Sequence, residues 1–484
     1  MTRTSTDLLI IGFGPTGATL AGLAARRGLR VTVVDRDREI YPLPRAVQCD
    51  HEVLRILQEI GCADEIMAGS IINDGITFLT ADRQTLLSAT VPALAATGWP
   101  SSVFFHQPSF ETVLRRTVAE LGVEILLGTE ATGISETAEG ARVSLADGSE
   151  LHARYIVGCD GARSLTRKLI GSTIDDTGFD ESWLVVDLLL QHGGGDRLPT
   201  RCLQVCDPAR PHTLVPMPSP RFRFEFMLHP GEDPDEIQDP ETIRSMLSSW
   251  VDPEIVEIER AAVYTFHGLV ASTWRSGPIF LAGDAAHQTP PFLGQGMCAG
   301  MRDAANLAWK LAAVIDGGAP DALLDSYQAE RAPHAKAVID AAVGFGQLIC
   351  MTDPAAAAER DAAMLASPAA DDEIPDFIPA LAMGAAISDG GGRLSPQPRL
   401  SGELLDELVG HQFAVLTSTP LQPSDRDAIF WSARAKLLDA ESQPELAALV
   451  GDTEAMVIRP DRYIFASGPL SEITQAARRV LDPA

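Results

Sequence analysis

Cysteines are few in this chain of 484 residues, and their pattern excludes two classes of protein. There are seven, an odd number, and no CxxC pair occurs anywhere. Neither a disulfide scaffold nor a dithiol redox centre is therefore expected. Cys202 and Cys206 lie close together, but no histidine or second cysteine pair follows at zinc spacing, so no metal site is predicted. Free buried thiols are the expected state.

Basic residues and uninterrupted apolar runs are also scarce. Lys and Arg number 38 against 66 Asp and Glu, which gives a formal net charge of −28. Such a surface repels nucleic acid and anionic membranes, so neither is an expected partner. The apolar stretch at residues 8–25 is broken by glycines and Pro15, which argues against a membrane span or a signal peptide. We expect a cytoplasmic protein of two or three domains.

A glycine-rich turn follows the first predicted strand. Residues 8–11 are apolar, and they lead into Gly12-Phe-Gly-Pro-Thr-Gly17 and a helix over about 15–27. The first glycine permits a tight turn, Gly14 lets the backbone approach a pyrophosphate, and Gly17 lets the helix pack on the strand. Asp35 ends the next strand and is placed to accept hydrogen bonds from a ribose. The alternative is a plain glycine turn beside a solvated aspartate.

A second motif separates FAD from NAD. The apolar strand 279–281 runs into Gly283 and Asp284, which places a carboxylate at the C-terminal end of a strand, where open α/β sheets bind ligands. That carboxylate suits a ribityl hydroxyl. The loop 294–297 (Gly-Gln-Gly-Met) opens a predicted helix over 301–315 and offers backbone amides to a flavin ring. The two motifs together predict FAD and redox chemistry.

The fold class expected is α/β, with a Rossmann-like FAD-binding domain and an inserted β-sheet domain for the substrate. Helix 109–120 and strands 124–127, 141–145 and 155–158 belong to the first domain. Residues 355–370 are alanine-rich and ambiguous, and 390–398 are typical of a linker. The expected divisions are 1–182 (with an excursion to the substrate domain at about 75–100), 183–268 for the substrate sheet, 269–388 for the return segment, and 389–484 for a small C-terminal domain.

These motifs resemble the class A flavoprotein aromatic hydroxylases. Residues 12–17 with Asp35 match the first family motif. Residues 160–167 (Asp-Gly-Ala-Arg-Ser-Leu-Thr-Arg) are similar to the family's DG motif, which serves both FAD and the pyridine nucleotide. Residues 283–284 match the third motif. Arg45, with its neighbours Pro44 and Ala46, and Gln107 stand where the family places an arginine and a glutamine against FAD.

The subgroup most similar in sequence is that of the 3-(3-hydroxyphenyl)propionate hydroxylases. The similarity lies in residues 183–187, 206–211, 223–227 and 302–310. Residues 459–463 resemble the end of the thioredoxin-like C-terminal domain of that subgroup. Because CxxC is absent, this domain is expected to be structural.

The resemblance implies one bound FAD and a set of residues that contact it. Many relatives carry asparagine where Cys298 stands, and because cysteine is a poor hydrogen-bond donor, only backbone contacts are expected there. The expected cofactor-binding residues are Gly12, Gly14, Pro15, Thr16, Gly17, Asp35, Arg36, Arg45, Ala46, Gln107, Asp160, Gly283, Asp284, Pro291, Gly294, Gln295, Gly296, Met297 and Cys298.

The resemblance also implies a single-component monooxygenase. NADH or NADPH, bound transiently, would reduce the flavin, and O2 would then give a C4a-hydroperoxide that hydroxylates a phenolic ring such as a 3-hydroxyphenylpropionate-like acid. Other possibilities stay open: a hydroxylase of a larger polycyclic or quinolone-type aromatic, a flavin oxidase or dehydrogenase without oxygen transfer, and a non-catalytic flavin sensor. Halogenation is disfavoured because no Trp-x-Trp-x-Ile-Pro segment exists. A homodimer is left open.

Two polar residues after Arg45 are candidates for the substrate end. Gln48 is expected to contact the substrate. His51 begins a predicted helix and could relay a phenol proton, because its ordinary pKa is near neutrality. The alternative is a capping Asp50 with an exposed His51.

Three further substrate contacts are expected downstream. Tyr264 and Phe292 could line the pocket, although aromatic side chains are more often plain core. Arg210 could pair with a substrate carboxylate in a bidentate fork, and a surface salt bridge is the alternative.

Overall fold

Five parallel strands form the middle of the first sheet, in the order β8-β2-β1-β11-β18. The computed structural model describes residues 6–43, 45–191, 198–366, 372–373, 378–384 and 386–482. The chain runs outward from β1 through β2 to β8 and then resumes on the other side of β1, so the order reverses between β1 and β11. In open α/β sheets, ligands bind in the crevice at such a point. The strands of this sheet are β1 (Thr6–Ile11), β2 (Val31–Asp35), β8 (Glu124–Leu127), β9 (Ala131–Thr137), β10 (Gly140–Leu145), β11 (Glu150–Gly158), β17 (Arg275–Ser276) and β18 (Ile279–Leu281).

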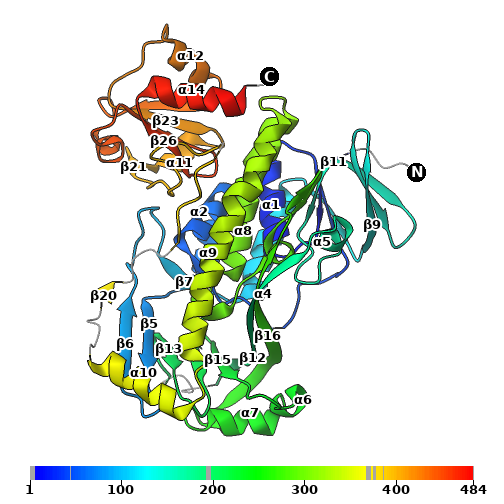
Figure 1. The fold of residues 1–484 in the computed structure, drawn as a ribbon, viewed down its shortest axis with the longest axis vertical. Coiled ribbons are helices and arrows are strands. Elements are labelled where there is room, and N and C mark those ends of the chain that lie inside the picture. The colour runs from blue at the N-terminus through cyan, green and yellow to red at the C-terminus, as the bar shows by residue number, and fades with distance from the viewer. Residues whose placement is uncertain are drawn as a thin grey trace.

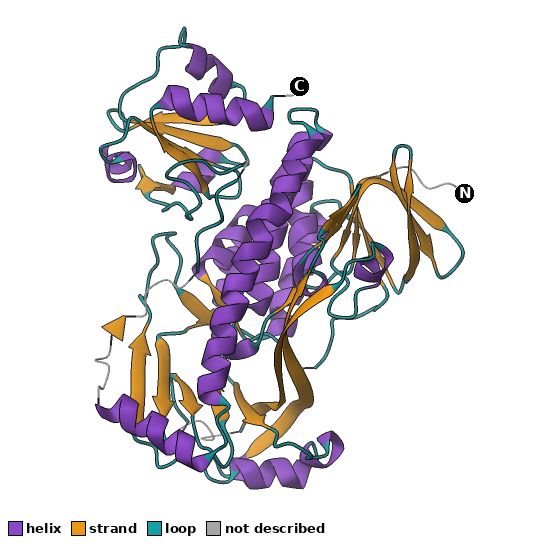
Figure 2. Ribbon diagram, in the orientation of Figure 1, coloured by secondary structure: helices purple, strands orange, loops and turns teal. Residues whose placement is uncertain are grey.

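The two faces of this sheet are covered differently. Leu8 and Ile10 pack with the helices on one face, whereas Leu9 and Ile11 pack against strands β9 and β10 on the other. Because successive side chains of a strand point to opposite faces, both faces of β1 are apolar. Figure 2 shows the helices gathered on one side of the sheet, with β9 and β10 projecting on the other.

Small residues bring the central helices close together. Helix α1 begins at Pro15, where a missing N–H costs nothing, and it packs on α8. A Cβ added at Gly300 in α8 would come within 2.3 Å of the Thr16 hydroxyl. The helices are α1 (Pro15–Arg26), α2 (His51–Ile60), α3 (Ala63–Ala68), α4 (Gln107–Glu120), α5 (Leu165–Leu169), α6 (Pro234–Ile237), α7 (Pro240–Leu247), α8 (Gly296–Ile315), α9 (Ser326–Ile349), α10 (Pro354–Ala366), α11 (Leu405–Val409), α12 (Arg426–Ser432), α13 (Ala447–Val450) and α14 (Leu470–Leu481).

Two helices differ from the sequence-based expectation. Helix α8 begins at Gly296, five residues before the predicted start. The chain changes direction at Gly294, which has a left-handed conformation (φ +65°), so the helix can begin directly after this turn. The glycine-rich loop therefore ends inside the helix, and its last residues supply first-turn amides. The ambiguous alanine-rich segment is helical as α10; its residues 367–370 and Pro44 lie outside the described residues.

A second, nine-stranded sheet lies beside the first, at the bottom of Figure 1. Its two long strands, β12 and β16, pair along most of their length. Strands β5 and β6 join it through a parallel pairing of β5 with β13, although they come much earlier in the chain. The strands, in sheet order, are β19 (His287–Gln288), β16 (Val256–Ala271), β12 (Ile174–Leu190), β15 (Arg221–Met227), β14 (His212–Pro216), β13 (Cys202–Val205), β5 (Gly75–Leu79), β6 (Thr85–Thr90) and β20 (Asp372–Glu373).

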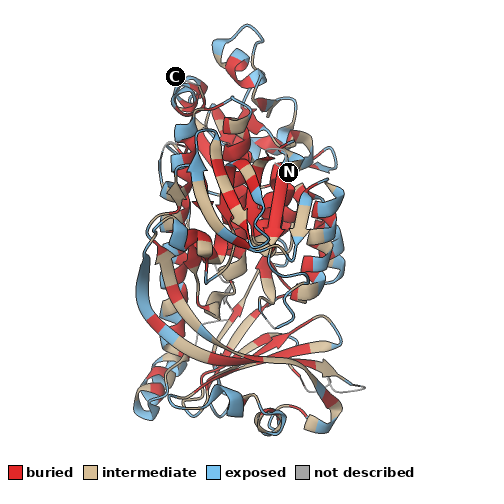
Figure 3. Ribbon diagram, turned by 90° about the vertical axis from the view of Figure 1, so that its right-hand side faces the viewer, coloured by how far each residue is buried: buried red, intermediate tan, exposed pale blue. Residues whose placement is uncertain are grey.

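Burial follows this layered arrangement. Figure 3 shows mainly buried strands in the first sheet, whereas strands of the second sheet alternate between buried and partly exposed residues. In β15, Phe222, Phe224 and Phe226 belong to a core shared with α7 on one face. The alternate residues of β15 therefore point to the other face, toward the first sheet.

The C-terminal residues form a separate four-stranded sheet in the order β24-β23-β25-β26. A buried ion pair between Arg55 in α2 and Asp406 fixes this unit to the rest (Nε–Oδ2 2.6 Å). A second buried group joins Lys310 in α8, Glu330 in α9 and Arg459. The likeness to thioredoxin and the domain bounds stay predictions. The remaining strands are β3 (Gln48–Asp50), β4 (Ile71–Ile72), β7 (Ser102–Phe104), β21 (Arg399–Leu400), β22 (Glu403–Leu404), β23 (Phe413–Thr417), β24 (Ala435–Asp439), β25 (Ala455–Ile458) and β26 (Ile464–Gly468).

Among the described residues, no single helix has the length and apolar composition of a membrane span; Asp321–Ile349 and Pro354–Ala366, bent by 108° relative to each other, reach them only as a pair. No group of three or more His, Cys, Asp or Glu side chains in the described part of the chain is arranged to hold a metal ion.

Candidate flavin and substrate site

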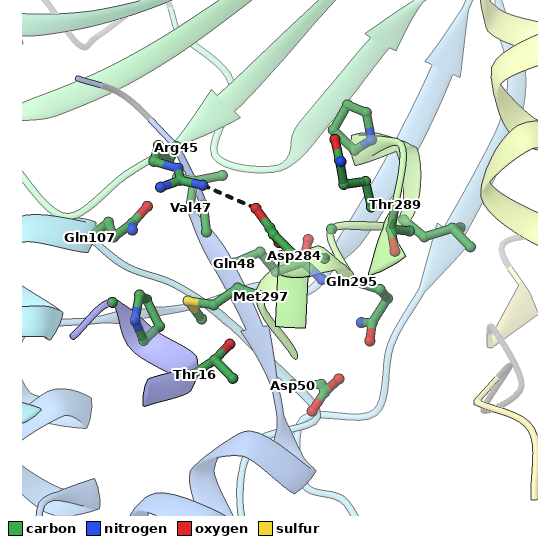
Figure 4. A pocket seen from close by; sticks show the side chains of 18 of the residues that line it. Thr16, Arg45, Val47, Gln48, Asp50, Gln107, Asp284, Thr289, Gln295 and Met297 are labelled. Carbon is green, nitrogen blue, oxygen red and sulfur yellow. Dashed lines mark hydrogen bonds and ion pairs between the residues drawn. The ribbon is translucent and has the colours of Figure 1, made fainter. Parts of the chain in front are cut away.

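One continuous cavity of about 1310 Å³ joins the crevice of the first sheet to the facing surface of the second. Small-molecule sites usually measure about 300–1,000 Å³, so the cavity has room for a long cofactor and a second molecule. Its lining includes Gly14 after β1, Asp35 at the end of β2, Asp284 after β18, and Tyr264 on β16. Both sequence motifs therefore open onto the same space. Figure 4 shows part of it.

The glycines of the first motif have separate roles. Gly12 has φ +103°, and a Cβ there would lie 2.3 Å from the carbonyl oxygen of Cys159. A Cβ at Gly17 would lie 2.0 Å from the carbonyl oxygen of Gly12, so this glycine permits helix–strand contact and does not line the cavity. An added Cβ at Gly14 meets nothing within 4 Å. Its backbone faces open space at the N-terminus of α1, where an anion is favoured. Pro15 and Thr16 line the same wall.

Asp35 is held firmly in place at the edge of the cavity. Its Oδ2 accepts a hydrogen bond from Phe13 N (2.6 Å), and its Oδ1 accepts one from Asp37 N (2.8 Å). Each carboxylate oxygen can accept a further bond. The residue thus ties the glycine-rich turn to the end of β2 while keeping acceptor capacity for a ribose. Arg36 also lines this end.

The DG motif forms a capped turn between β11 and α5. Asp160 accepts from the Ser164 hydroxyl (2.5 Å) and from Thr166 N (2.9 Å). Arg167 extends from this turn and donates to the carbonyl oxygen of Ala285 (2.9 Å). The DG turn and the turn that carries Asp284 are therefore fixed to each other. Asp160 itself lines the cavity.

Asp284 projects from a turn that is built around Asp303. Gly283 (φ +63°) donates its N–H to Asp303 Oδ2 (3.0 Å), and His287 Nε2 lies 2.7 Å from the same oxygen. Gly283 does not line the cavity. Arg45 Nη2 lies 3.2 Å from Asp284 Oδ2, and the two side chains point toward one another in Figure 4. This pair leaves both groups partly exposed to the cavity.

The first turn of α8 forms another wall. Pro291, Gly294, Gln295, Gly296 and Met297 line the cavity. Cys298 does not: its side chain is fully buried, and its thiol contacts the carbonyl oxygen of Gly294 (3.8 Å). The Cys298 side chain therefore faces the core, in agreement with the expectation of backbone contacts alone at this position, and that backbone contact stays a prediction.

Buried charges support the floor of the cavity. Arg302 donates from Nη1 to Gln295 Oε1 (2.8 Å), from Nε to Glu52 Oε2 (2.6 Å), and from Nη2 to Asp50 Oδ2. Burial alone would raise the pKa of Asp50, but Arg302, together with His51 and the backbone N–H of Val53, lowers the pKa below its ordinary value. Asp50 also caps α2 by accepting from Glu52 N and Val53 N. The capping alternative for Asp50 is therefore observed, while His51 and Gln48 line the cavity.

Two aromatic residues that were predicted as substrate contacts lie in the cavity wall. Tyr264 and Phe292 both line the cavity. The hydroxyl of Tyr264 is buried and finds no hydrogen-bond partner among the described residues. Burial raises the pKa of Tyr264 to about 12, so the side chain is a neutral hydrogen-bond donor at ordinary pH. Phe266 and Ile349 add apolar surface nearby.

Arg210 is placed elsewhere, which corrects the expectation that it binds a substrate carboxylate. It does not line the cavity. Its Nη2 lies 2.6 Å from Glu232 Oε1, and its Nη1 donates to the carbonyl oxygen of Met227 (2.9 Å). The salt-bridge alternative is the one observed.

Sequence reasoning missed a polar part of the cavity wall on the second sheet. Glu225, Thr213 and Gln204 line the cavity from three adjacent strands. A signal was present in residues 221–227 (Arg-Phe-Arg-Phe-Glu-Phe-Met), where phenylalanine alternates with charge. Strand periodicity sends the charged residues to the face opposite the phenylalanine core.

The donors and acceptors of the cavity fit FAD. Gln107 donates to Glu111 Oε1 (2.7 Å), but its own Oε1 is buried without a partner in the described structure. The free amides of two helix N-termini, the open backbone at Gly14 and the Asp284 carboxylate lie along one cavity. These groups suit a pyrophosphate and a polyol chain. Ala46 also lines the wall beside Arg45.

Comparison with known proteins agrees with this geometry. The family model described as "FAD binding domain" matches residues 5–342. A probable NADH-specific resorcinol 4-hydroxylase of Rhodococcus jostii (strain RHA1) is 36% identical over 493 residues, covering 96% of this chain and 92% of its own. A 3-(3-hydroxy-phenyl)propionate/3-hydroxycinnamic acid hydroxylase of Mycobacterium sp. (strain JLS) is 39% identical over 436 residues, covering 85% and 76%.

A solved structure shows the same fold. Aklavinone-11 hydroxylase, in a ternary complex with FAD and aklavinone, superposes with a TM-score of 0.82 at 23% identity, covering 100% of both chains. The chain belongs to the FAD-binding-domain family of flavoprotein hydroxylases. The expectations of FAD as cofactor and of an FAD-dependent aromatic hydroxylase are confirmed.

Proposed function

We propose that the protein is a single-component monooxygenase that uses FAD, NADH and O2 to hydroxylate a phenol. The observation that carries the proposal is the continuous cavity, which joins the Gly14 and Asp284 walls to an aromatic and polar surface on the second sheet. NADH is proposed over NADPH because a relative that covers nearly the whole chain is named as NADH-specific. When bound, FAD would accept electrons from NADH and would activate O2.

The cofactor would lie along the walls formed by the first sheet. Gly14 and the N-terminus of α1 would hold the pyrophosphate, Asp35 the ribose and Asp284 a ribityl hydroxyl. Gly296 and Met297, in the first turn of α8, would offer backbone amides to the ring. The partial positive charge of that helix end favours negative charge next to it.

The substrate would lie under the second sheet. Phe266, Phe292 and Ile349 supply apolar surface that excludes water from the reacting atoms. Tyr264 stays protonated because its pKa is about 12, so it can donate a hydrogen bond to the phenol oxygen. We also propose that His51, which lines the cavity, accepts the phenol proton.

A substrate screen tests this function. Purified protein with FAD is mixed with NADH in air, with and without phenols of increasing size. We expect small phenols to accelerate NADH oxidation and to appear as products with one added oxygen atom by mass spectrometry. NADH oxidation that yields only hydrogen peroxide would indicate an oxidase instead. Turnover confined to polycyclic aromatics would indicate a tailoring hydroxylase.

The same proposal includes the cellular setting. We propose a cytoplasmic enzyme, and its net charge of −28 disfavours a nucleic-acid or membrane partner. Sedimentation would distinguish a homodimer, which the sequence leaves open, from a monomer.

A further inference from the structure

A carboxyl group of the second sheet faces the proposed substrate end of the cavity. Glu225 lies in β15 between Phe224 and Phe226, which point into the opposite core. Its side chain is 16% exposed, and it lines the cavity. The exposed part of the Glu225 side chain therefore faces the cavity. No step of the proposed function uses this group.

Glu225 belongs to a short polar strip across three strands. It pairs in register with Thr213 of β14. The Thr213 hydroxyl donates to Gln204 Oε1 on β13 (2.8 Å), and all three residues line the cavity. Val185 and Val215 line it beside them. A carboxyl, a hydroxyl and an amide thus form one hydrogen-bonding patch on the second sheet.

The nearby positive charge is already engaged. Arg223 donates from Nε and Nη2 to Asp187 (2.7 and 3.1 Å) and from Nη1 to the carbonyl oxygen of Arg45 (2.5 Å). Its Nη1 lies 3.6 Å from Glu225 Oε1, which is too far for a good hydrogen bond. Arg45 is paired with Asp284. The basic groups next to the strip are therefore committed to other partners.

This arrangement disfavours a second carboxylate. Burial raises the pKa of Glu225 although Arg223 opposes it, which shows how little solvation this position offers a negative charge. A substrate carboxylate here would lose its hydration without gaining a free guanidinium, and an unpaired buried charge is costly. An uncharged hydroxyl, in contrast, can donate to Glu225 and keep a hydrogen bond.

We propose that Glu225 selects a neutral dihydroxybenzene, such as resorcinol, over a phenol that bears a carboxylate side chain. Its carboxyl accepts a hydrogen bond from the hydroxyl remote from the reacting ring position, and Thr213 and Gln204 hold that end of the ring. The inference rests on the proposed function and narrows its substrate class.

The test compares binding of two probes to the oxidised, FAD-loaded enzyme without NADH. Resorcinol and 3-(3-hydroxyphenyl)propionate are titrated, and the change in the flavin spectrum gives each dissociation constant. We expect wild type to bind resorcinol at least tenfold more tightly. In Glu225→Gln the ratio should shift at least tenfold toward the propionate, because the charge is removed while hydrogen bonding is kept. Glu225→Leu should weaken resorcinol binding as well.

Glu257→Gln is the matched control, because it makes the same chemical change at an exposed position of β16 in the same sheet. Its probe ratio should equal that of wild type, and FAD content reports folding in every variant. Tighter binding of the propionate by wild type, or a ratio unchanged in Glu225→Gln, overturns the inference. If both phenols are still hydroxylated, the proposed function survives that result. If neither phenol binds or reacts, both fail.

Discussion

The two sides of the cavity are built in different ways. The wall on the first sheet, called the cofactor wall below, consists of backbone turns after β1, β11 and β18. Glycines are needed at Gly12 and Gly283 because their φ angles are positive. The wall on the second sheet, called the substrate wall below, consists of alternate side chains from adjacent strands, such as Glu225 and Thr213. Backbone geometry of this kind suits a cofactor that a whole family shares. Side chains on strands can change without altering the strands, which suits the selection of a substrate that varies.

Gly12→Ala should break the cofactor wall most severely. The new Cβ would lie 2.3 Å from the Cys159 carbonyl oxygen at φ +103°, and we expect a loss of about 4 kcal/mol of stability. Urea unfolding of wild type and Gly12→Ala measures the difference in the free energy of unfolding. Gly14→Ala is the paired variant: its φ is −70° and its Cβ meets no atom within 4 Å. It should keep stability but lose FAD, and equal stability losses in both variants would contradict this account.

Acid should next loosen the buried contacts that join the C-terminal unit to α8 and α9. Burial alone would raise the pKa of Glu330, but Arg459 and Lys310 hold it at about 2. Because the folded-state pKa is below the ordinary 4.5, this stabilisation is complete above about pH 4.5 and is lost as the pH falls toward 2. The shift corresponds to about 3 kcal/mol.

Urea unfolding between pH 7 and pH 3 measures this loss of stability in acid. Glu330→Gln should start less stable, because Lys310 and Arg459 lose their partner, and should lose less stability in acid than wild type does. An equal loss of stability in acid in both proteins would show that protonation of Glu330 is not its cause.

Asp284→Ala should have a smaller, local effect. Removing a carboxylate that holds a hydroxyl forfeits about 1.5–3 kcal/mol, so FAD affinity should fall by about tenfold to a hundredfold, without a change in unfolding. Fluorescence titration of the apoprotein with FAD measures it. Asp316→Ala removes an exposed carboxylate at the C-terminal end of α8; it is the control and should bind FAD like wild type. A fall of similar size in both variants would show that charge alone is responsible.

Tyr264→Phe should give the smallest change, and only on the substrate side. Loss of one neutral hydrogen bond costs about 1 kcal/mol, so phenol binding should weaken about fivefold while FAD binding stays the same. Because the pKa of Tyr264 is about 12, phenol binding in wild type should show no titration of this group between pH 7 and 10. A change in FAD affinity would place Tyr264 in the cofactor wall instead.

The sequence predicted the cofactor wall better than the substrate wall, and the reason is physical. A glycine at Gly12 or an aspartate at Asp284 is recognisable because a turn after a strand has few solutions, and those residues stand at fixed positions. The start of α8 was misplaced because helix propensity does not reveal that a left-handed Gly294 already completes the turn.

The substrate wall was harder to predict because it depends on register between distant strands. The pairing of Glu225 with Thr213 is set by turns and by the phenylalanine core, and neither position has a motif. Arg210 was misassigned because its partner Glu232 approaches through a loop whose path the sequence does not reveal. The inward direction of the Cys298 side chain could not be predicted either, because one turn of helix decides whether a side chain faces the cavity or the core.

A crystal structure of the FAD complex tests the central claim most directly. We expect one FAD molecule with its pyrophosphate beside Gly14, its ribityl chain beside Asp284 and its ring facing the wall that holds Tyr264. Electron density that places the cofactor in only one of these sites, or a ring directed away from the second sheet, would contradict it.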